Sequence, residues 1–387
     1  MSSIGERANT QRDHTVEPGS GSALVERRMS SAMDARTQRA AIVLAGGEGT
    51  RLQSFTESVT GRAIPKQYCP VSGTETMLQW TLRRVSLRIA RRSILPVVAA
   101  AHAEFYESQL SDIDEQSLVV EPQNRGTASA ILHGLLRLAK LIPDGAVAIF
   151  PSDHYVSDDC RFMRYVDLAF DYIQTFPQRM VLLGIQPNGP EVDYGWVEPG
   201  RPAVLGGSVF QNLLRVRRFH EKPPLAMAEE LFRRGCLWNS FVLVGNTRRL
   251  LALIAGALPV HYRSFSAVRA TLASSLEVQA IEFLYRSLPA ADFSYGVLQK
   301  VFSSMVVVPV TGLEWSDLGT PERLLAVLRR TGAAVRDVTV PNFQTRSEAP
   351  PSRTSLPGAT ESLFAASTQP IAVRQHEFHP PRRVHLS

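Results

Sequence analysis

Short apolar runs alternate with longer amphipathic segments through the middle of the chain. The runs, which are rich in β-favouring residues, cover 41–45, 94–101, 118–120, 146–150, 180–185, 241–244 and 305–310. Segments with a helical period lie near 76–90, 103–110, 127–140, 160–175, 247–257, 279–288 and 321–330. Strands that are apolar on both faces are typical of a parallel sheet covered by helices on each side. The pattern therefore predicts an α/β fold with a mostly parallel, doubly wound, Rossmann-like sheet.

One folded domain is predicted between two polar ends. Residues 1–39 are rich in Ser, Arg and Glu and have no sustained period, while residues 346–387 are rich in Pro, Ser and Thr. Such segments cannot bury enough apolar surface to fold alone. Of the 387 residues 44% are hydrophobic, which is enough for a sizeable core between these ends. We expect a flexible arm over 1–39, a single domain over 40–345 and a disordered tail over 346–387.

The composition argues against several classes of protein. Three cysteines without a CxxC pair cannot build a disulfide framework or a cysteine-rich zinc site. No apolar run is long enough to cross a bilayer, and the first forty residues lack the apolar centre of a secretory signal. The net charge of +6 is spread along the chain rather than gathered in a basic stripe, which disfavours nucleic acid. We expect a cytoplasmic protein with no membrane or nucleic-acid partner.

The first chemical signal directly follows the first apolar run. The segment Ala45-Gly46-Gly47-Glu48-Gly49-Thr50-Arg51-Leu52 has three glycines in four positions, so its backbone can approach a ligand and aim amide groups at an anion. Arg51 can brace a phosphate through two hydrogen bonds. Leu52 stands where a dinucleotide fingerprint needs its third glycine, and no Gly-Lys-Ser/Thr follows for a Walker loop. Alone, the segment is compatible with phosphate binding and with an ordinary strand-to-helix turn.

A rare lysine strengthens the phosphate interpretation. Only four of the 42 basic residues are lysines, and Lys66 stands in Pro65-Lys66-Gln67-Tyr68 shortly after the glycine loop. LAGGEGTRL followed by PKQY resembles the signature of sugar-1-phosphate nucleotidyltransferases. EPQNRGTA at 121–128 and PSDH at 151–154 are similar to the mannose-1-phosphate guanylyltransferase branch, and YGWVE, FHEKP, WNS and WSDLG follow in the family's order. The resemblance covers about residues 40–330, three quarters of the chain.

The resemblance implies a nucleotidyltransferase-type fold, with the domain over 40–345 as the catalytic one, and a defined reaction. An oxygen of mannose 1-phosphate would attack the α-phosphorus of GTP, giving GDP-mannose and pyrophosphate with Mg²⁺ as cofactor. The second pKa of such a phosphate is about 6, so the attacking group is already largely dianionic and needs no general base. His154 is therefore not assigned as a base. GTP and mannose 1-phosphate would be the small-molecule partners, and a homo-oligomer is left open.

The resemblance also assigns roles to individual residues. Those expected to act in catalysis are Arg51, Lys66 and Lys222. Those expected to bind the nucleotide are Gly46, Gly47, Gly49, Thr50, Arg51, Arg125 and Thr127. The sugar phosphate is expected at Gly195, Glu198, Lys222 and Asn239, and the metal at Asp153 and Asp317, since paired carboxylates beside a triphosphate suit Mg²⁺. Without the family, each aspartate fits a helix N-cap or a turn, and Lys222 and Glu198 fit surface turns.

Some positions depart from the family's pattern. Phe241 replaces the glycine that usually follows Trp-Asn-Ser, and a benzyl group there could narrow the sugar pocket or shift Asn239. Asp292 matches an acidic position near the sugar. Two alternatives stay open: a sister enzyme with another sugar and nucleotide pair, and a non-catalytic homologue that binds nucleotide sugars. Many relatives append an isomerase domain, but the residues after Arg330 are too few and too polar for one, so we expect no second activity.

Overall fold

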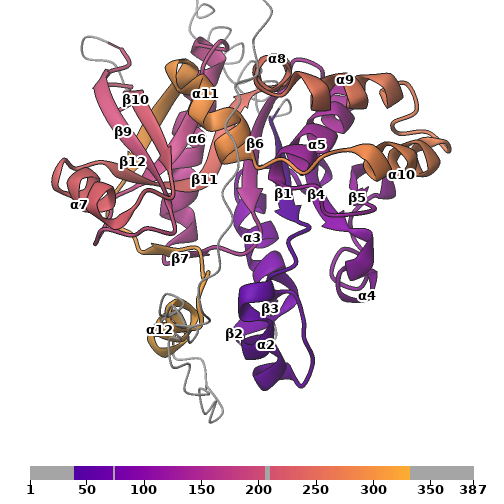
Figure 1. Ribbon diagram of the computed structural model, residues 1–387, viewed down its shortest axis with the longest axis horizontal. Helices are drawn as coiled ribbons and strands as arrows, with labels where there is room; N and C mark the ends of the chain where they lie inside the picture. Colours follow the sequence, from indigo (N-terminus) through magenta and orange to yellow (C-terminus); the bar gives the residue numbers. More distant parts are fainter. Residues whose placement is uncertain (1–38, 73–74, 205–209, 332–387) are drawn as a thin grey trace, which may run out of the picture. The chain divides into compact units, whose positions relative to one another are not determined.

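A nine-stranded mixed sheet organises the chain (Figure 1). The computed structural model describes residues 39–72, 75–204 and 210–331. In order across the sheet, the strands are β5 (Val119–Glu121), β4 (Ile94–Ala99), β1 (Arg39–Ala45), β6 (Ala146–Pro151), β11 (Leu237–Asn246), β8 (Met180–Ile185), β12 (Met305–Val310), β10 (Leu214–Glu221) and β9 (Gly195–Pro202). Every apolar run identified in the sequence contributes a strand to this sheet.

The direction of the strands divides the sheet into two halves. β5, β4, β1 and β6 are parallel neighbours, and β8 pairs with β12 in parallel as well. β11 runs antiparallel to β6, β8 and β9, and β10 runs antiparallel to β12 and β9. The expectation of a mostly parallel sheet holds for the first group of strands and is wrong for β9, β10 and β11. β9 and β10 were not predicted because they are not continuous apolar runs: β10 carries Arg215, Arg217 and Arg218, and Glu198-Pro199-Gly200 interrupts β9.

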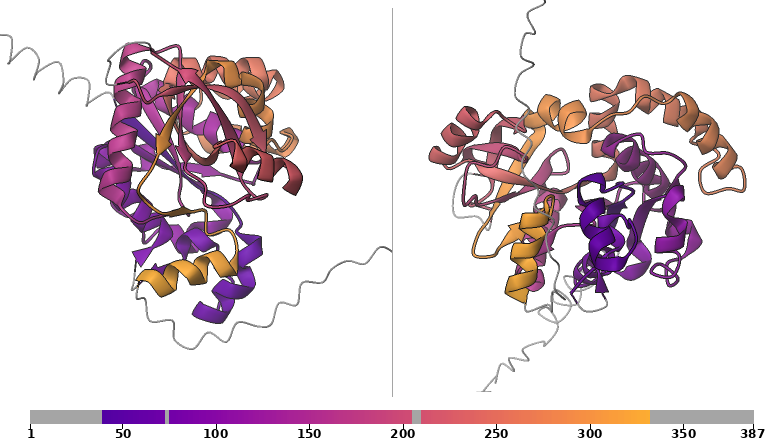
Figure 2. Two further views of the ribbon diagram at one scale, coloured as in Figure 1. Left: turned by 90° about the vertical axis from the view of Figure 1, so that its left-hand side faces the viewer. Right: turned by 60° about the horizontal axis from the view of Figure 1, so that its bottom comes forward.

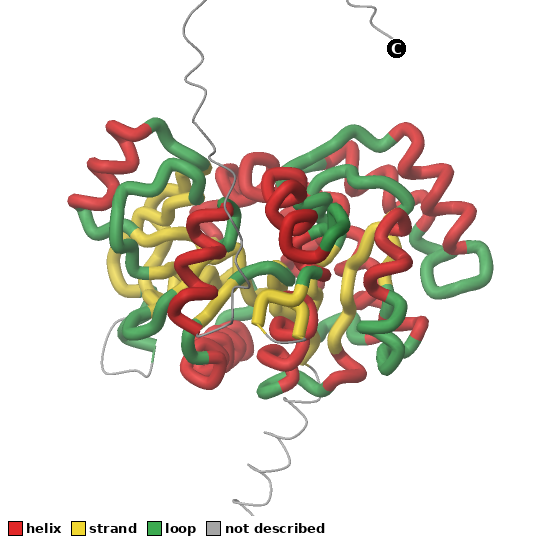
Figure 3. Tube along the Cα trace, turned by 90° about the horizontal axis from the view of Figure 1, so that it is seen from below, coloured by secondary structure: helices red, strands yellow, loops and turns green. Residues whose placement is uncertain are grey.

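Helices cover both faces of the sheet. α3 (Met77–Ser86) and α6 (Asp159–Thr175) pack on one face, and α5 (Thr127–Leu141), α8 (Thr247–Ala257), α9 (Pro259–Val268) and α10 (Glu277–Ser287) pack on the other (Figures 1 and 3). Successive residues of β1 alternate between the two cores, with Ala41 and Val43 in one and Ala40 and Ile42 in the other. The predicted helices are present, although α4 (Ala103–Tyr106) is shorter than expected, and α2 (Gln53–Thr60), α7 (Leu225–Arg233), α9 and the short α11 (Gln299–Val301) were not predicted.

A third, smaller core joins the two ends of the described chain. Leu52 and Phe55 from the region of α2 pack with Leu318 and with Leu324 of α12 (Pro321–Thr331). Met77, Leu325 and Val327 complete this cluster. Figure 2 shows α12 beside α2. The cluster brings the segment after the glycine loop against the segment that carries Asp317.

The boundaries of the fold differ slightly from the prediction. Arg39, expected in the flexible arm, is the first residue of β1, and its buried guanidinium donates to Asp167 at 2.9 Å and to Asp171 at 2.7 Å on α6. The rest of the predicted arm, residues 332–345 and the predicted tail lie outside the described residues. Among the helices that the structure describes, none has the length and apolarity needed to cross a membrane.

Candidate active site

Side chains of the Pro-Lys-Gln-Tyr motif fix the glycine loop after β1 by hydrogen bonds to backbone carbonyl oxygens. Gln67 Nε2 donates to the carbonyl oxygens of Ala45 at 2.9 Å and Gly47 at 2.7 Å, and Tyr68 Oη donates to that of Ala45 at 2.8 Å. Gly49 has a φ of 62°, and a Cβ there would lie 3.0 Å from Lys66 N, so the turn favours glycine strongly. Gln67 and Tyr68, which stand in the sequence only as parts of a motif, fix the shape of the loop.

This arrangement leaves donors of the loop available to a ligand. The amide groups of Gly47, Glu48 and Gly49 donate to no backbone carbonyl within the described residues. Thr50 and Arg51 are exposed, and the Arg51 guanidinium has no hydrogen bond or ion pair to any residue in the part of the chain that the structure describes. Free amides and a free guanidinium next to one another can bind a phosphate group.

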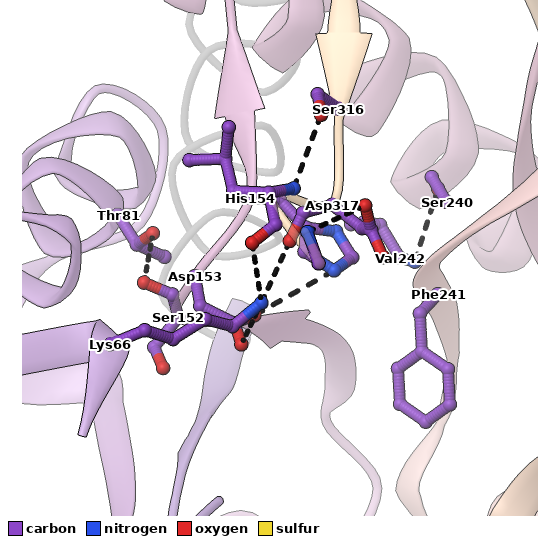
Figure 4. Close-up of polar contacts among 12 residues, drawn as sticks. Lys66, Thr81, Ser152, Asp153, His154, Ser240, Phe241, Val242, Ser316 and Asp317 are labelled. Atoms are coloured by element: carbon purple, nitrogen blue, oxygen red, sulfur yellow. Dashed lines mark hydrogen bonds and ion pairs between the residues drawn. The ribbon is translucent and has the colours of Figure 1, made fainter. Parts of the chain in front are cut away.

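Lys66 joins the two aspartates predicted to hold a metal. Its ammonium lies 3.0 Å from Asp153 Oδ2 and donates to the carbonyl oxygen of Asp317 at 2.8 Å (Figure 4). Asp153 precedes β7 (Tyr155–Val156) and Asp317 follows β13 (Trp315–Ser316); these two strands pair antiparallel, with Tyr155 opposite Ser316. The ladder therefore brings residues 153 and 317, which are far apart in sequence, to the same end of one strand pair.

The charges around Asp317 keep its carboxylate ionised. Oδ1 accepts from Tyr194 Oη at 3.0 Å, from the Gly319 amide at 2.9 Å and from Arg323 Nη1 at 3.1 Å. Burial alone would raise the pKa of Asp317, but His154, Lys66 and Arg323 lower this pKa below its usual value on balance.

The surroundings of His154 disfavour the protonated form of its ring. Its ring lies edge-on to Trp315, with 5.1 Å between the ring centroids. Burial lowers the pKa of His154 to about 4, although Asp153 favours the charged form. The His154 imidazole is therefore mostly uncharged at neutral pH and binds a proton weakly.

The aspartate pair has the chemistry of a magnesium site. Asp317 Oδ2 accepts no hydrogen bond from the described residues, and Asp153 Oδ1 has only His154 Nε2 near it, at 3.7 Å. No group of three or more His, Cys, Asp or Glu side chains able to hold a metal occurs in the described part of the chain. Mg²⁺ takes one or two protein carboxylates and completes its shell with water and phosphate oxygens, so a two-carboxylate site fits it.

A second cluster lies on the antiparallel strands. A Cβ at Gly195 would lie 2.6 Å from Glu221 Oε2 and 3.3 Å from Asn239 Cβ, which places these three residues together. Glu221 Oε2 is buried and has no hydrogen-bond partner among the described residues. Burial and, to a smaller extent, nearby Asp292 raise the pKa of Glu221 to about 7 against the opposing effect of Lys222. A buried acceptor without a protein partner next to a glycine can accept a hydrogen bond from a ligand.

Tyr194 connects the two clusters. Its hydroxyl donates to Asp317, its carbonyl oxygen accepts from the Lys222 amide at 3.2 Å, and it directly precedes Gly195. Lys222 is exposed, and its ammonium has no hydrogen bond or ion pair within the described residues. The structure therefore brings Lys66, the two aspartates, Lys222 and the glutamate cluster to one connected region.

Other residues expected in the site have different surroundings. Glu198 lies two strand positions beyond Trp196, on the opposite face of β9 from Gly195, and its carboxylate pairs with Arg234 and with Arg217 at 3.4 Å. Burial raises the pKa of Glu198, but the arginines lower it below its usual value on balance. The structure separates Glu198 from Gly195 and Asn239, because neighbouring positions of a strand face opposite ways and the prediction did not have the register.

The side chains of Arg125 and Thr127 also form hydrogen bonds to other residues of the chain. Arg125 Nε donates to the carbonyl oxygen of Tyr285 at 3.0 Å, near the end of α10. Thr127 Oγ1 donates to Asp292 Oδ2 at 3.1 Å and accepts from the Phe293 amide at 2.8 Å. Both side chains hold the start of α5 against other segments, and the structure does not bring them to the glycine loop through any described contact.

Glu121 is a candidate that the sequence analysis missed. It ends β5 and is buried, and its Oε1 accepts from Tyr285 Oη at 2.8 Å. A Cβ at Gly46 would lie 3.1 Å from Glu121 Oε2, and this oxygen accepts no hydrogen bond from the described residues. Burial raises the pKa of Glu121 to about 7. The position of Glu121 directly before Pro122, at the carboxyl end of a parallel strand, is the sequence signal from which it could have been predicted as a site residue.

A glycine loop after the first strand of an α/β sheet, with cations and carboxylates at the same edge, is typical of enzymes that transfer phosphate-bearing groups. The chain belongs to the Nucleotidyl transferase family, whose sequence profile matches residues 40–333.

Named relatives confirm the resemblance to the mannose-1-phosphate guanylyltransferase branch. The Salmonella montevideo protein of that name is 26% identical over 283 residues, 72% of this chain and 58% of the relative. The xanthan biosynthesis protein XanB of Xanthomonas campestris pv. campestris is 28% identical over 299 residues, 75% of this chain and 60% of the relative. The chain therefore matches about three fifths of the length of these curated relatives.

A solved structure supports the same fold. A Thermus thermophilus protein described as a mannose-1-phosphate geranyltransferase is similar with a TM-score of 0.63 and 27% identity, covering 75% of this chain and 79% of that one.

Proposed function

We propose that the protein transfers GMP from GTP to mannose 1-phosphate, releasing pyrophosphate and giving GDP-mannose, and that it acts in the cytoplasm. The observation that carries the proposal is the connection from the glycine loop through Lys66, Asp153 and Asp317 to Tyr194 and the Gly195 cluster. Free phosphate-binding groups lie at one end of this connection and an unpartnered acceptor lies at the other. Names of relatives that cover the same segment support the mannose and guanine pair.

The reaction needs two polyanions to be brought together. A phosphate oxygen of mannose 1-phosphate forms a bond to the α-phosphorus of GTP, and the bond from that phosphorus to the bridging oxygen of the leaving pyrophosphate breaks. The free amides of Gly47 and Gly49 and the Arg51 guanidinium hold the triphosphate, Lys66 neutralises charge beside Asp153, and Lys222 meets the sugar phosphate. Because the nucleophile is already deprotonated, positioning and charge supply the catalysis.

Asp153 and Asp317 would hold Mg²⁺, which when bound supplies positive charge that stabilises the phosphate oxygens in the transition state. Lys66 keeps the Asp153 carboxylate in place, and Tyr194, Gly319 and Arg323 do the same for Asp317. Each carboxylate is thus oriented by this chain before any ligand binds.

Glu121 is our candidate for the residue that recognises the guanine base of GTP. Its free Oε2 beside the glycine loop can accept from the N1 and N2 groups of guanine, and Tyr285 fixes the other oxygen. Inosine triphosphate lacks the N2 amine. We expect Glu121→Gln to lower the preference for GTP over inosine triphosphate about tenfold, since a good paired contact is worth about 1–3 kcal/mol. Glu282→Gln, an exposed change on α10, is the matched control.

A substrate panel tests the proposed function. Pyrophosphate release is measured for purified full-length protein with GTP, ATP, UTP and dTTP, each with mannose 1-phosphate and glucose 1-phosphate. We expect the highest kcat/KM for GTP with mannose 1-phosphate. Preference for another pair would assign a sister enzyme, and binding of GDP-mannose without turnover of any pair would assign a regulatory homologue.

A further inference from the structure

Phe241 has an unusual backbone conformation within β11. Its φ is 60°, in the left-handed region that a residue with a side chain rarely adopts. The pairing of β11 with β8 is irregular between Asn239 and Leu243, so Phe241 sits in a bulge of the strand. This is the position where the sequence analysis noted an aromatic residue in place of a glycine. A bulky residue in this strained conformation makes the position a candidate for a functional role.

The bulge connects directly to the Gly195 cluster. The Phe241 amide donates to Asn239 Oδ1 at 3.1 Å, and Asn239 Cβ is among the atoms that a Cβ at Gly195 would meet. This bond occupies the acceptor of the Asn239 side chain and leaves its Nδ2 as a donor. The amide of Asn239 and the free Oε2 of Glu221 thus form a donor and an acceptor for sugar hydroxyl groups.

The ring of Phe241 borders the same region. It is half-buried and lies edge-on to Phe293, with 6.2 Å between the centroids. Phe293 follows Asp292, whose charge acts on Glu221. In Figure 4 the ring projects from β11 on the side away from Ser240. The ring contact to Phe293, the effect of the neighbouring Asp292 on Glu221 and the bond to Asn239 place Phe241 in the neighbourhood of this cluster.

We propose that Phe241 is a specificity-determining residue whose ring limits the volume beside Asn239 and Glu221, so that the site takes an unsubstituted hexose 1-phosphate and excludes one with a bulky substituent such as an N-acetyl group. The inference rests on the proposed function and deepens it. A single extra carbon in an apolar pocket changes selection about 10- to 200-fold, so the loss of a whole ring has a measurable effect.

The experiment removes the ring and keeps the backbone bond to Asn239. Phe241→Gly and Phe241→Ala are compared with wild type and with Phe283→Ala, which removes an aromatic ring that is 73% exposed on α10. Glucose 1-phosphate and N-acetylglucosamine 1-phosphate, which differ only by the substituent at C2, are measured as competitors of mannose 1-phosphate at saturating GTP. The readout is the ratio of their two inhibition constants.

We expect wild type to bind the N-acetylated sugar at least about tenfold more weakly than glucose 1-phosphate. The ratio should fall at least about fivefold in both Phe241 variants and stay within twofold of wild type in Phe283→Ala. Thermal unfolding provides the fold control: Phe241→Gly should be at least as stable as Phe241→Ala, because glycine tolerates the positive φ.

The possible outcomes distinguish a failure of this inference from a failure of the proposed function. An unchanged ratio in both variants of an active enzyme overturns the role of Phe241 alone, and so does an equal loss of kcat with every sugar at a constant ratio, since that is the mark of a purely structural residue. Absence of turnover by wild type with every sugar phosphate and nucleotide overturns the proposed function and this inference together.

Discussion

The two halves of the sheet position their functional groups in different ways. The parallel half consists of β5, β4, β1 and β6. Here the candidate functional groups lie on loops just beyond the strands: the glycine loop follows β1 and Asp153 follows β6. In the antiparallel half, which is formed around β9, β10 and β11, the candidate groups Gly195, Glu221 and Asn239 lie within the strands themselves. The first arrangement depends on where strands end, and the second depends on register and on bulges. The comparison predicts that variants in the parallel half mainly affect phosphate chemistry, while variants in the antiparallel half mainly affect the sugar.

The largest effect is expected at Asp153 in the parallel half. Asp153→Asn should lower kcat about 100- to 1,000-fold while the protein stays folded, because under the proposed function it removes a carboxylate charge that would hold Mg²⁺ at the triphosphate. Steady-state pyrophosphate release measures kcat, and circular dichroism checks the fold. Asp144→Asn, an exposed change just before β6, should keep wild-type activity. Activity of Asp153→Asn within threefold of wild type would place the chemistry elsewhere.

Lys66 should follow with a somewhat smaller loss. Lys66→Met should lower kcat/KM for GTP about 100-fold, because it removes the ammonium beside Asp153 and the donor to the Asp317 carbonyl. Lys300→Met is a matched control, since Lys300 also donates to a backbone carbonyl, that of Ala257 at 3.0 Å, but on the exposed surface. Equal activity of the two variants would contradict a role for Lys66 in the site.

Glu221 tests the antiparallel half. Glu221→Gln should lower kcat/KM for mannose 1-phosphate about tenfold through KM and leave the KM for GTP near wild type, because under the proposed function the Glu221 carboxylate would accept from a sugar hydroxyl group. A general loss for both substrates would remove the distinction between the halves.

The effect of the same substitution on stability should depend on pH. The pKa of Glu221 is raised to about 7 in the folded protein, so its carboxyl group favours folding below its ordinary pKa of 4.5, and this stability is lost as pH rises through 7. Glutamine does not ionise. Urea unfolding should therefore show Glu221→Gln more stable than wild type by about 1–3 kcal/mol at pH 8, with a clearly smaller difference at pH 5. A difference that is the same at both pH values would rule out this titration.

The smallest effect on activity is expected at Glu198, on the other face of β9. Glu198→Gln should change kcat/KM less than about threefold and lower the free energy of unfolding by about 1 kcal/mol, because it breaks contacts to Arg234 and Arg217. A double-mutant cycle with Arg234→Gln measures the coupling of the pair. A tenfold change in sugar preference would restore the role that the sequence suggested.

The parallel half could be predicted from the sequence because both its strands and its motifs are local signals. Strands such as 41–45 and 146–150 are continuous apolar runs, and the glycine loop directly follows one of them. The β7–β13 ladder, which aligns Asp153 with Asp317, could not be predicted, because two strands of two residues each leave no periodic signal. The order of the motifs, together with the position of each aspartate after an apolar run, carried that expectation.

The antiparallel half was harder to predict for a physical reason. A motif such as YGWVE gives the right segment, but only the register decides that Gly195 faces Glu221 while Glu198 faces Arg234. Gln67, Tyr68 and Glu121 were missed because their contributions are hydrogen bonds or close approaches to backbone far away in sequence. Such partners appear only once the chain is folded.

The contact between Lys66 and the Asp317 carbonyl joins positions 251 residues apart, and this has a consequence during translation. At about 5–20 residues per second, the ribosome releases the later partner about 10 to 50 s after the earlier one. Throughout that interval the nascent polypeptide carries the glycine loop but lacks the strand that aligns the aspartates. Under the proposed function, the contact between Lys66 and Asp317 therefore forms only after residues 315–317 have emerged, and we expect shorter nascent chains to be inactive.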